Sequence, residues 1–158
     1  MSLRKAANLS PAERKLVITR VFDAPRELVF RMWTDLRHAM AWWGPKHHPA
    51  VHLDMDVRPG GRWRNCLRST ETGTDLWHNG VFREVVAPER LVFTFLWEEE
   101  GERGLETLVT ITFADENGKT RMTLCQEPFQ SMAEREGHGE GWNSTFDRLA
   151  EHLSPRQA

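Results

Sequence analysis

Five polar residues stand where their side chains could face an internal cavity and perform acid–base chemistry. They are His78, Arg83, Glu84, Gln126 and His138. A buried imidazole, carboxyl or amide group could orient the carbonyl oxygen of a ligand, or transfer a proton in a reaction of the cyclase or hydrolase type. The same residues could instead lie on the solvated outer face of a sheet. The pattern is therefore compatible with an enzymatic function, but it assigns no catalytic residue.

Nucleophilic and metal-dependent chemistry have less support. A serine or cysteine nucleophile must be held against a base, but the sequence has no Gly-x-Ser-x-Gly motif, and Cys66 and Cys125 lie in strand-like segments without a local motif. A structural zinc site usually takes four ligands from cysteines and histidines. The chain has no Cys-x-x-Cys pair, and its clustered histidines lie in a loop-like segment: His47, His48 and His52. We therefore predict neither a metal nor a cofactor.

Large aromatic residues dominate the predicted interior. The chain has seven tryptophans, eight phenylalanines and no tyrosine. Indole rings interlock less densely than aliphatic side chains, so they could leave a void that suits a flat hydrophobic ligand. The alternative is that the rings simply fill a closed core. The residues that we predict to line the void are Trp33, Trp63, His78, Phe82, Phe93, Phe95, Trp97, Trp142 and Phe146.

A long helix near the C-terminus is the element that must cover this void. Its apolar stripe follows the i, i+4, i+7, i+11 spacing of one helix face and consists of Trp142, Phe146, Leu149 and Leu153. Ser131 and Glu134 fit a capping box at its start. Three glycines between residues 137 and 141 should weaken its first half and let a strand or ligand approach closely. Their spacing lacks the full G-x-G-x-x-G pattern of a nucleotide-binding loop.

Strand-like segments make up most of the remaining chain. A first strand is predicted at residues 15–22, where β-branched residues are frequent. From residue 51 the hydrophobic period is two, and short turns separate predicted strands at 51–56, 62–69, 76–86, 90–97, 106–114 and 120–126. Because the loops between consecutive strands are short, we expect an antiparallel meander.

Two short helices are predicted between the first and second strands. Asp23 is predicted to cap the first helix, with Pro25 in its first turn. Asp35 is predicted to cap the second, and Gly44-Pro45 to end it. The predicted buried face of the first helix is Leu28, Val29, Met32 and Trp33. The second predicted helix carries Leu36, Ala39, Met40 and Trp43.

These elements predict one α+β domain in which a long helix covers a curved antiparallel sheet. We expect the domain at residues 15–153, after a flexible arm at 1–14 and before a tail at 154–158. A chain of 158 residues is large enough to bury one core. Whether a cavity remains between the sheet and the helix depends on how strongly the sheet bends.

Charge and composition argue against several classes of function. The net charge of −2 and the isoelectric point of about 6.4 disfavour a general binder of nucleic acids. A basic edge, which we predict to be solvated, consists of Arg58, Arg62, Arg64 and Arg68. No apolar run reaches the roughly 18 residues of a membrane span, and the N-terminus lacks the apolar segment of a signal peptide. With only two cysteines, we predict no disulfide framework and a cytoplasmic location.

Four sequence motifs resemble those of a known superfamily. They are Val21-Phe22-Asp23-Ala24-Pro25-Arg26-Glu27-Leu28-Val29-Phe30, Trp42-Trp43-Gly44-Pro45, Asp56-Val57-Arg58-Pro59-Gly60-Gly61-Arg62-Trp63 and the segment from Gly141-Trp142 through Leu153. With the order of the elements, they resemble the START / Bet v 1-like (SRPBCC) superfamily. Within it, they resemble the family named after the activator of the ATPase of the 90-kDa heat-shock chaperone. The resemblance runs from about Lys15 to Leu153.

The resemblance implies a helix-grip fold. In that fold a seven-stranded antiparallel sheet wraps around the long C-terminal helix, and two short helices close one end of the groove. Relatives in the wider superfamily bind lipids, hormones or polyketides, and some are cyclases. The eukaryotic namesake has an additional N-terminal domain that engages the chaperone, which we do not expect in this chain.

Three functions follow as expectations. The first is a protein that binds or sequesters a hydrophobic small molecule between the sheet and the C-terminal helix. The second is a cyclase or hydrolase that uses polar residues of the same cavity. The third is a protein-interaction module, either as a homodimer or with a chaperone partner.

Overall fold

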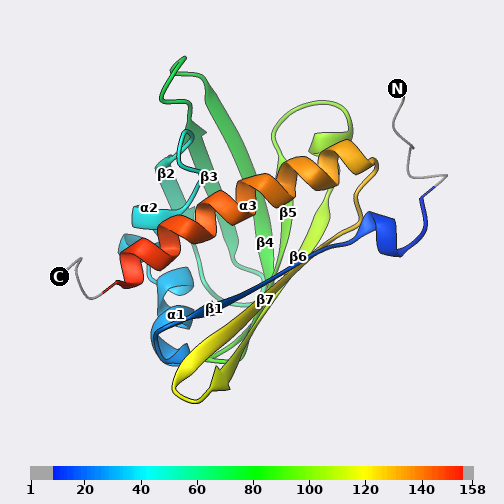
Figure 1. The fold of residues 1–158 in the computed structure, drawn as a ribbon. Coiled ribbons are helices and arrows are strands. Elements are labelled where there is room, and N and C mark those ends of the chain that lie inside the picture. Colours follow the sequence, from blue (N-terminus) through cyan, green and yellow to red (C-terminus); the bar gives the residue numbers. More distant parts are fainter. Residues whose placement is uncertain (1–8, 155–158) are drawn as a thin grey trace.

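One curved sheet of seven antiparallel strands carries the long helix α3 across one face (Figure 1). The computed structural model describes residues 9–154. The strands are β1 (Leu16–Phe22), β2 (Ala50–Met55), β3 (Arg62–Arg68), β4 (Asp75–Val86), β5 (Arg90–Trp97), β6 (Thr107–Glu116) and β7 (Lys119–Glu127). Their order across the sheet is β1-β7-β6-β5-β4-β3-β2. The predicted α+β class and the antiparallel meander are both confirmed.

Two short helices, α1 (Arg26–Thr34) and α2 (Leu36–Trp42), follow β1. Asp35 caps α2 as predicted, because its carboxylate accepts a hydrogen bond from the backbone N–H of Arg37 at 3.0 Å. The predicted cap of α1 at Asp23 is wrong. Pro25 itself occupies the N-cap position with an extended backbone, and no side chain caps this end. Asp23 therefore stands two residues upstream of the cap position.

The predicted second helix needs one correction. The helix ends at Trp42, which is fully buried, so Trp43 follows the helix instead of belonging to it. Leu36 is 42% exposed, because it begins the helix on its solvent side. The backbone then turns at Gly44, whose φ of +95° lies in the left-handed region that glycine tolerates. This turn directs Trp43 inward.

The helix α3 (Met132–Leu153) runs without interruption through its three glycines. The backbone N–H of Glu134 donates to the Ser131 hydroxyl at 3.2 Å, so this half of the predicted capping box forms. The Glu134 carboxylate instead contacts His138 on the same helix and Arg103 from the turn between β5 and β6. Trp142 and Phe146 are buried on the predicted stripe, and Leu153 packs against the core.

The core lies between α3, the α1–α2 pair and the inner face of the sheet. Trp33 of α1 is its centre, 1% exposed. Its ring contacts rings from all sides: Trp42, Trp43, Phe93, Trp142 and Phe146. Each such buried aromatic side chain contributes about 1.5–3 kcal/mol by leaving water. This packing fixes the distance of α3 from the sheet at the α1 end.

The described part of the predicted N-terminal arm packs onto the domain. Residues 1–8 of that arm lie outside the described residues, as do 155–158 of the predicted tail. Leu9 is buried, and Ala12–Arg14 form the 3₁₀ turn η2. The backbone N–H of Phe129 donates to the carbonyl of Arg14 at 2.9 Å. The domain therefore extends further toward the N-terminus than the predicted start at residue 15.

Candidate functional site

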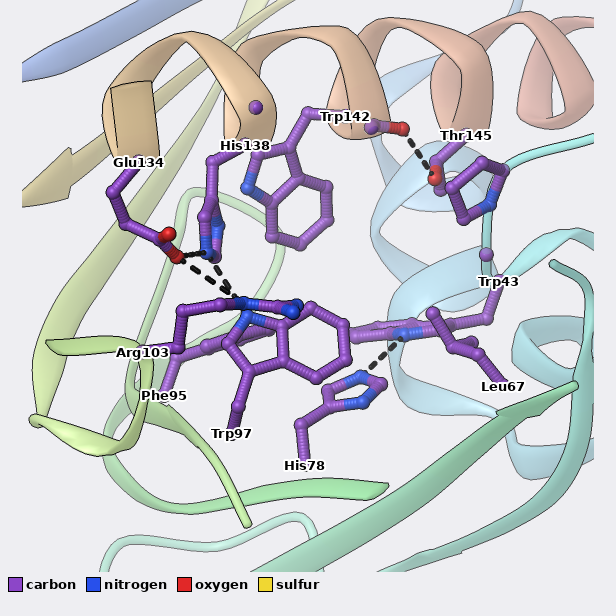
Figure 2. A pocket seen from close by; sticks show the side chains of 14 residues that line it. Trp43, Leu67, His78, Phe95, Trp97, Arg103, Glu134, His138, Trp142 and Thr145 are labelled. Carbon is purple, nitrogen blue, oxygen red and sulfur yellow. Dashed lines mark hydrogen bonds and ion pairs between the residues drawn. The ribbon is translucent and has the colours of Figure 1, made fainter. Parts of the chain in front are cut away.

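A cavity of about 320 Å³ lies between α3, the strands β3 to β5 and the turn that follows α2 (Figure 2). Trp142 and Thr145 reach into it from α3, whereas His78 and Trp97 reach into it from the sheet (Figure 2). The residues that line it are Trp43, Gly44, Pro45, Leu67, His78, Phe95, Trp97, Arg103, Glu134, Gly137, His138, Gly141, Trp142 and Thr145. The wall is therefore largely aromatic, with a few polar side chains.

Four of the nine sequence-predicted cavity residues stand in this wall, and five do not. The four are His78, Phe95, Trp97 and Trp142. The five that pack elsewhere in the interior are Trp33, Trp63, Phe82, Phe93 and Phe146. The space beside Trp33, Trp63, Phe82 and Phe93 is only about 10 Å³, roughly one water molecule. Direct contact of these five with a ligand would need movement of the core.

Sequence reasoning did not place several lining residues at the cavity. Glu134 could have been found, because it precedes His138 and Trp142 at intervals of four and thus lies on the same helix stripe. Trp43 was assigned to a helix face, although it lies in the turn after α2. Arg103 belongs to the short 3₁₀ turn η3 (Glu102–Gly104) between β5 and β6. Residues in such a turn carry no periodic signal.

His78 is the most enclosed polar side chain of the wall. It is 1% exposed, and its ring lies 4.6 Å from that of Trp97 and 4.9 Å from that of Phe95, centroid to centroid. Burial, and to a smaller extent the neighbouring His138, lower the pKa of His78 to about 3. The imidazole is therefore neutral at physiological pH.

The hydrogen-bond pattern fixes the tautomer of His78. The indole N–H of Trp43 donates to Nε2 of His78 at 3.2 Å. An indole nitrogen can only donate, so Nε2 must be the unprotonated nitrogen and Nδ1 must carry the proton. Nδ1 has no hydrogen-bond partner among the described residues. This unpaired nitrogen has almost no accessible surface, so the surrounding rings enclose it.

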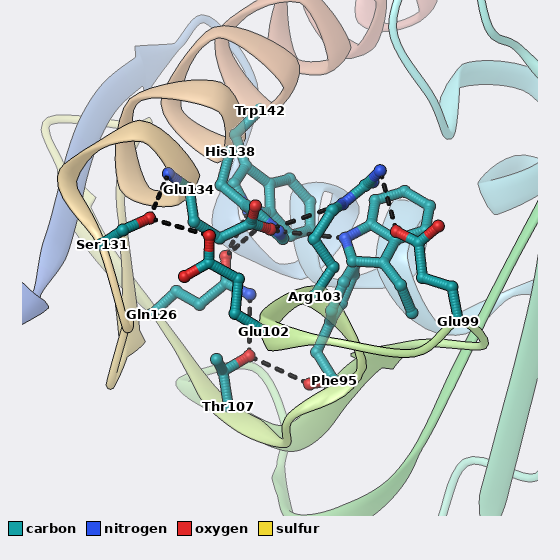
Figure 3. A network of polar contacts seen from close by, with 11 residues as sticks. Phe95, Glu99, Glu102, Arg103, Thr107, Gln126, Ser131, Glu134, His138 and Trp142 are labelled. Atoms are coloured by element: carbon teal, nitrogen blue, oxygen red, sulfur yellow. Dashed lines mark hydrogen bonds and ion pairs between the residues drawn. The ribbon is translucent and has the colours of Figure 1, made fainter. Parts of the chain in front are cut away.

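A second polar group joins α3 to the sheet (Figure 3). The Trp142 indole N–H donates to Oε1 of Gln126 at 2.8 Å, and Nδ1 of His138 lies 3.1 Å from the same oxygen. Nε2 of Gln126 donates to the hydroxyl of Thr107 at 2.9 Å. Because the indole fixes which end of the amide is the oxygen, Nδ1 of His138 must carry a proton.

The other nitrogen of His138 has two competing partners. The indole N–H of Trp97 lies 3.0 Å from Nε2, and Oε1 of Glu134 lies 3.1 Å from it. The contact with Trp97 needs an unprotonated Nε2. The contact with Glu134 needs a proton between oxygen and nitrogen. Nε2 of His138 can therefore form a hydrogen bond with only one of these two partners at a time.

Arg103 covers the rim of the cavity beside this pair. Its guanidinium lies over the Trp97 ring, 4.4 Å from the centroid. It also forms ion pairs with Glu99 at 2.9 Å and with Glu134 at 3.5 Å. Among the lining residues it is the sole arginine or lysine. Its charge is therefore already compensated by two carboxylates.

The remaining polar candidates lie outside the cavity. Arg83 and Glu84, predicted as possible cavity residues, are exposed on β4 and pair with Glu106 and Arg90 respectively. His52 pairs with Asp54 at 2.7 Å on the surface of β2. Within residues 9–154, no group of three or more His, Cys, Asp or Glu side chains is arranged to hold a metal ion.

Three of the four arginines of the predicted basic edge pair with carboxylates. Ion pairs join Arg58 to Asp56, Arg64 to Glu98 and Arg68 to Asp75, each at 2.7 or 2.8 Å. Both cysteines are free thiols, and burial raises the pKa of each. Over the described part of the chain, no helix combines the length and hydrophobicity that a membrane crossing requires.

Comparison with known proteins places these features in a family. The model of the family described as activator of Hsp90 ATPase homolog 1-like protein matches residues 23–154. No match was found among curated proteins. The matched range includes every residue that lines the cavity.

Solved structures share the whole fold. A protein from Chromobacterium violaceum is 25% identical with a TM-score of 0.83, and the match covers 90% of this chain and 98% of that one. A protein from Nitrosomonas europaea is 27% identical with a TM-score of 0.77, covering 94% and 99%. A protein of the same family from Silicibacter pomeroyi is 26% identical with a TM-score of 0.79, covering 88% and 96%.

Proposed function

The chain belongs to the family of activator of Hsp90 ATPase homolog 1-like proteins, and within it we propose that this member binds or sequesters a flat, largely apolar small molecule. The observation that carries the proposal is the cavity of about 320 Å³ between α3 and the sheet. Ligand sites typically have volumes of ~300–1,000 Å³ and mostly apolar walls with a few polar groups. This cavity lies at the small end of that range, which favours a ligand of two or three fused rings.

The aromatic wall supports a flat ligand in particular. Trp43, Trp97 and Trp142 approach the space from three different elements. Rings of this size prefer offset-stacked or edge-to-face contacts with other aromatic rings. The wall is held in place by hydrogen bonds, since the N–H groups of these three indoles donate to side chains within the domain. A rigid wall loses little freedom when a ligand binds.

A thermal-shift screen with two-ring and three-ring aromatic compounds tests the proposal. At a ligand concentration of 100 times Kd, binding adds about 2.7 kcal/mol to the free energy of unfolding, which raises Tm by roughly 5–10 °C for a domain of this size. We expect Trp97→Ala to lose this stabilisation, because Trp97 lines the cavity.

Trp77→Ala is the matched control for this screen. Trp77 belongs to the same sheet, but its ring lies under the Arg64 guanidinium and outside the cavity wall. Its removal should leave the ligand-induced rise in Tm unchanged. The proposal is wrong if no compound of a broad panel stabilises the wild-type protein, or if both alanine variants respond alike.

A second candidate function is acid–base catalysis in the same cavity. The observation that favours it is the competition of Glu134 and Trp97 for Nε2 of His138. A carboxyl group and an imidazole in contact can take a proton from water and return it to a leaving group. The side chains of Glu134 and His138 are 15% and 10% exposed, so both remain accessible from the cavity.

Hydrolysis of 4-nitrophenyl 2-naphthoate tests this second candidate. The oxygen of a water molecule would bond to the acyl carbon, its proton would pass to the Glu134–His138 pair, and the bond to 4-nitrophenolate would break. We expect Glu134→Gln to lower kcat at least ~100-fold, which is the usual effect of losing a general base. Glu140→Gln, an exposed glutamate of the same helix, is the control and should have no effect. Equal rates for these two variants would exclude the mechanism.

A further inference from the structure

The turn that follows α2 and the helix α3 form facing parts of the cavity wall. Trp43, Gly44 and Pro45 line the cavity from the turn, whereas Gly141 and Thr145 line it from α3. No strand pairing holds the turn in place, because it lies between α2 and β2. The contacts that fix this turn against α3 therefore determine the shape of the cavity on this side.

Arg148 of α3 holds the turn through three backbone carbonyls. Its Nη1 donates to the carbonyl oxygens of Trp43 at 3.0 Å and of Gly44 at 2.8 Å. Its Nη2 donates to the carbonyl oxygen of Ala41 at 3.1 Å. A guanidinium carries five N–H donors in a rigid planar fork, so one side chain can fix several carbonyls in a single arrangement.

Ser144, one helical turn before Arg148, holds the other end of the same segment. Its hydroxyl accepts a hydrogen bond from the backbone N–H of Lys46 at 2.9 Å. The two side chains of α3 thus contact the segment 41–46 at both ends, and the residues that line the cavity lie between these contacts.

The position of Arg148 has a cost that its hydrogen bonds must offset. Burial lowers the pKa of the Arg148 guanidinium, and the nearby charge of Glu151 opposes this shift. Partial removal of a charge from water is unfavourable unless polar partners replace the water. The backbone carbonyls of the turn are those partners, so the guanidinium and the turn depend on each other.

We infer that Arg148 is a positioning residue of the cavity: it holds the segment 41–46 against α3 and so keeps Trp43 in the wall before a ligand arrives. This inference rests on the ligand-binding function proposed above. Arg148 does not line the cavity itself. Its loss should therefore lower ligand affinity without removing a contact to the ligand, because binding would then have to order the wall.

Hydrogen exchange of indole N–H groups, followed by NMR without ligand, tests the positioning directly. Arg148→Met keeps an aliphatic stem but has no donor. In this variant we expect the Trp43 indole N–H to exchange at least about tenfold faster, as the loss of hydrogen bonds to a charged group implies. The Trp63 indole N–H, which donates to the carbonyl of Thr94 within the sheet, should be unchanged. A general loss of stability would accelerate both.

Calorimetric titration with acridine at pH 8, where this compound is uncharged, measures the consequence for binding. We expect Arg148→Met to weaken binding roughly three- to tenfold, which corresponds to the cost of ordering one side chain. Arg148→Lys should lie between this variant and the wild type, because an ammonium group lacks the planar fork.

Arg135→Met is the matched control for both measurements. Arg135 belongs to the same helix and also donates to a backbone carbonyl, that of Glu13 at 3.4 Å, but it does not contact the segment 41–46. Its replacement should leave the exchange of the Trp43 indole and the affinity for acridine at their wild-type values.

The possible failures are distinct. If acridine does not bind the wild-type protein but Trp43 exchanges faster in Arg148→Met, the positioning stands and the ligand-binding function fails for this probe. Unchanged exchange in folded Arg148→Met, or equal acceleration in Arg135→Met, would overturn the inference. Faster exchange with wild-type affinity for acridine would overturn it as well. If Arg148→Met does not fold, the same two measurements on Arg148→Lys decide the question.

Discussion

We expect Gly141→Leu to weaken binding of a flat aromatic ligand by up to about 100-fold while the fold stays as stable as the wild type or becomes more stable. Gly141 lines the cavity in the middle of α3. A Cβ atom added there would meet a single neighbour, Cγ of Pro45 at 3.9 Å, which is an ordinary van der Waals contact. The rest of a leucine side chain would extend into the space that the ligand needs.

The substitution should change the ligand affinity and the stability of the helix in opposite directions. Overpacking of an occupied site typically costs 1–3 kcal/mol, and about 2.7 kcal/mol corresponds to 100-fold in Kd. A glycine inside a helix costs roughly 0.5–1 kcal/mol relative to alanine, and leucine is nearly as good a helix former as alanine. The substitution should therefore raise the stability of the helix and lower the affinity for the ligand. Calorimetric titration and thermal unfolding measure the two quantities separately.

Gly139→Ala is the matched control for this substitution. It brings the same gain in helix propensity, but its Cβ atom would meet Cδ1 of Leu16 on β1 at 3.4 Å, away from the cavity. We expect unchanged ligand affinity for Gly139→Ala and an intermediate loss for Gly141→Ala. Wild-type affinity in folded Gly141→Leu would show that the ligand does not occupy this cavity.

The architecture could be predicted from the sequence because each level of the pattern agrees with the next. The predicted segment 90–97 coincides with β5, since its alternating residues, its turn signals and its position in the meander all point to a strand. The predicted strand at 106–114 corresponds to β6 at Thr107–Glu116, which differs only at its ends. Such boundaries depend on pairing with neighbouring strands and are weakly encoded locally.

The cavity wall was harder to predict, because periodicity gives the face of an element but not the depth along a groove. Trp142 and Phe146 share the stripe of α3, yet Trp142 lines the cavity while Phe146 is sealed in the core. What separates them is their neighbours along the groove, which a single-helix pattern does not contain. The ring of Trp33 contacts Trp142 of α3, and it also contacts Trp43 from the turn after α2.

Periodicity also failed to predict which isolated polar residues face the interior. His78 and Glu84 lie on one strand and are an even number of residues apart, so strict alternation would place them on the same face. The β4–β5 register shifts between Phe82 and Glu84, and this irregularity turns Glu84 to the solvent. Nothing in the sequence around Phe82 and Glu84 indicates this bulge. The inward position of His78 and the outward position of Glu84 therefore had to come from the structure.

The second large effect that we expect is a loss of stability in mild acid that depends on His78. In the folded protein burial lowers the pKa of His78 to about 3, whereas an unfolded chain has a histidine pKa of about 6.5. Below pH 6.5 the unfolded state therefore binds a proton that the folded state does not. Stability is full above the unfolded pKa and is lost as the pH falls toward the folded pKa.

The magnitude follows from the linkage relation. Each pH unit well between the two pKa values removes about 1.4 kcal/mol, so the wild type should lose about 2 kcal/mol from this residue between pH 6.5 and pH 4.5. His78→Gln is the reference, because its amide oxygen can still accept from the Trp43 indole but the side chain does not titrate. Urea unfolding of both proteins at several pH values gives the two curves.

The difference between the curves isolates His78 from the other groups that titrate in acid. The pKa values of Asp75, Glu98 and Glu116 are lowered by their arginine partners, and their contributions are lost in both proteins as the pH falls. The pKa of His152 is lowered by burial and then by His38, again in both. We therefore expect the curves to diverge below pH 6.5 and the wild type to fall more steeply. Parallel curves would mean that His78 takes up a proton without penalty, which is incompatible with a dry, neutral donor in the cavity wall.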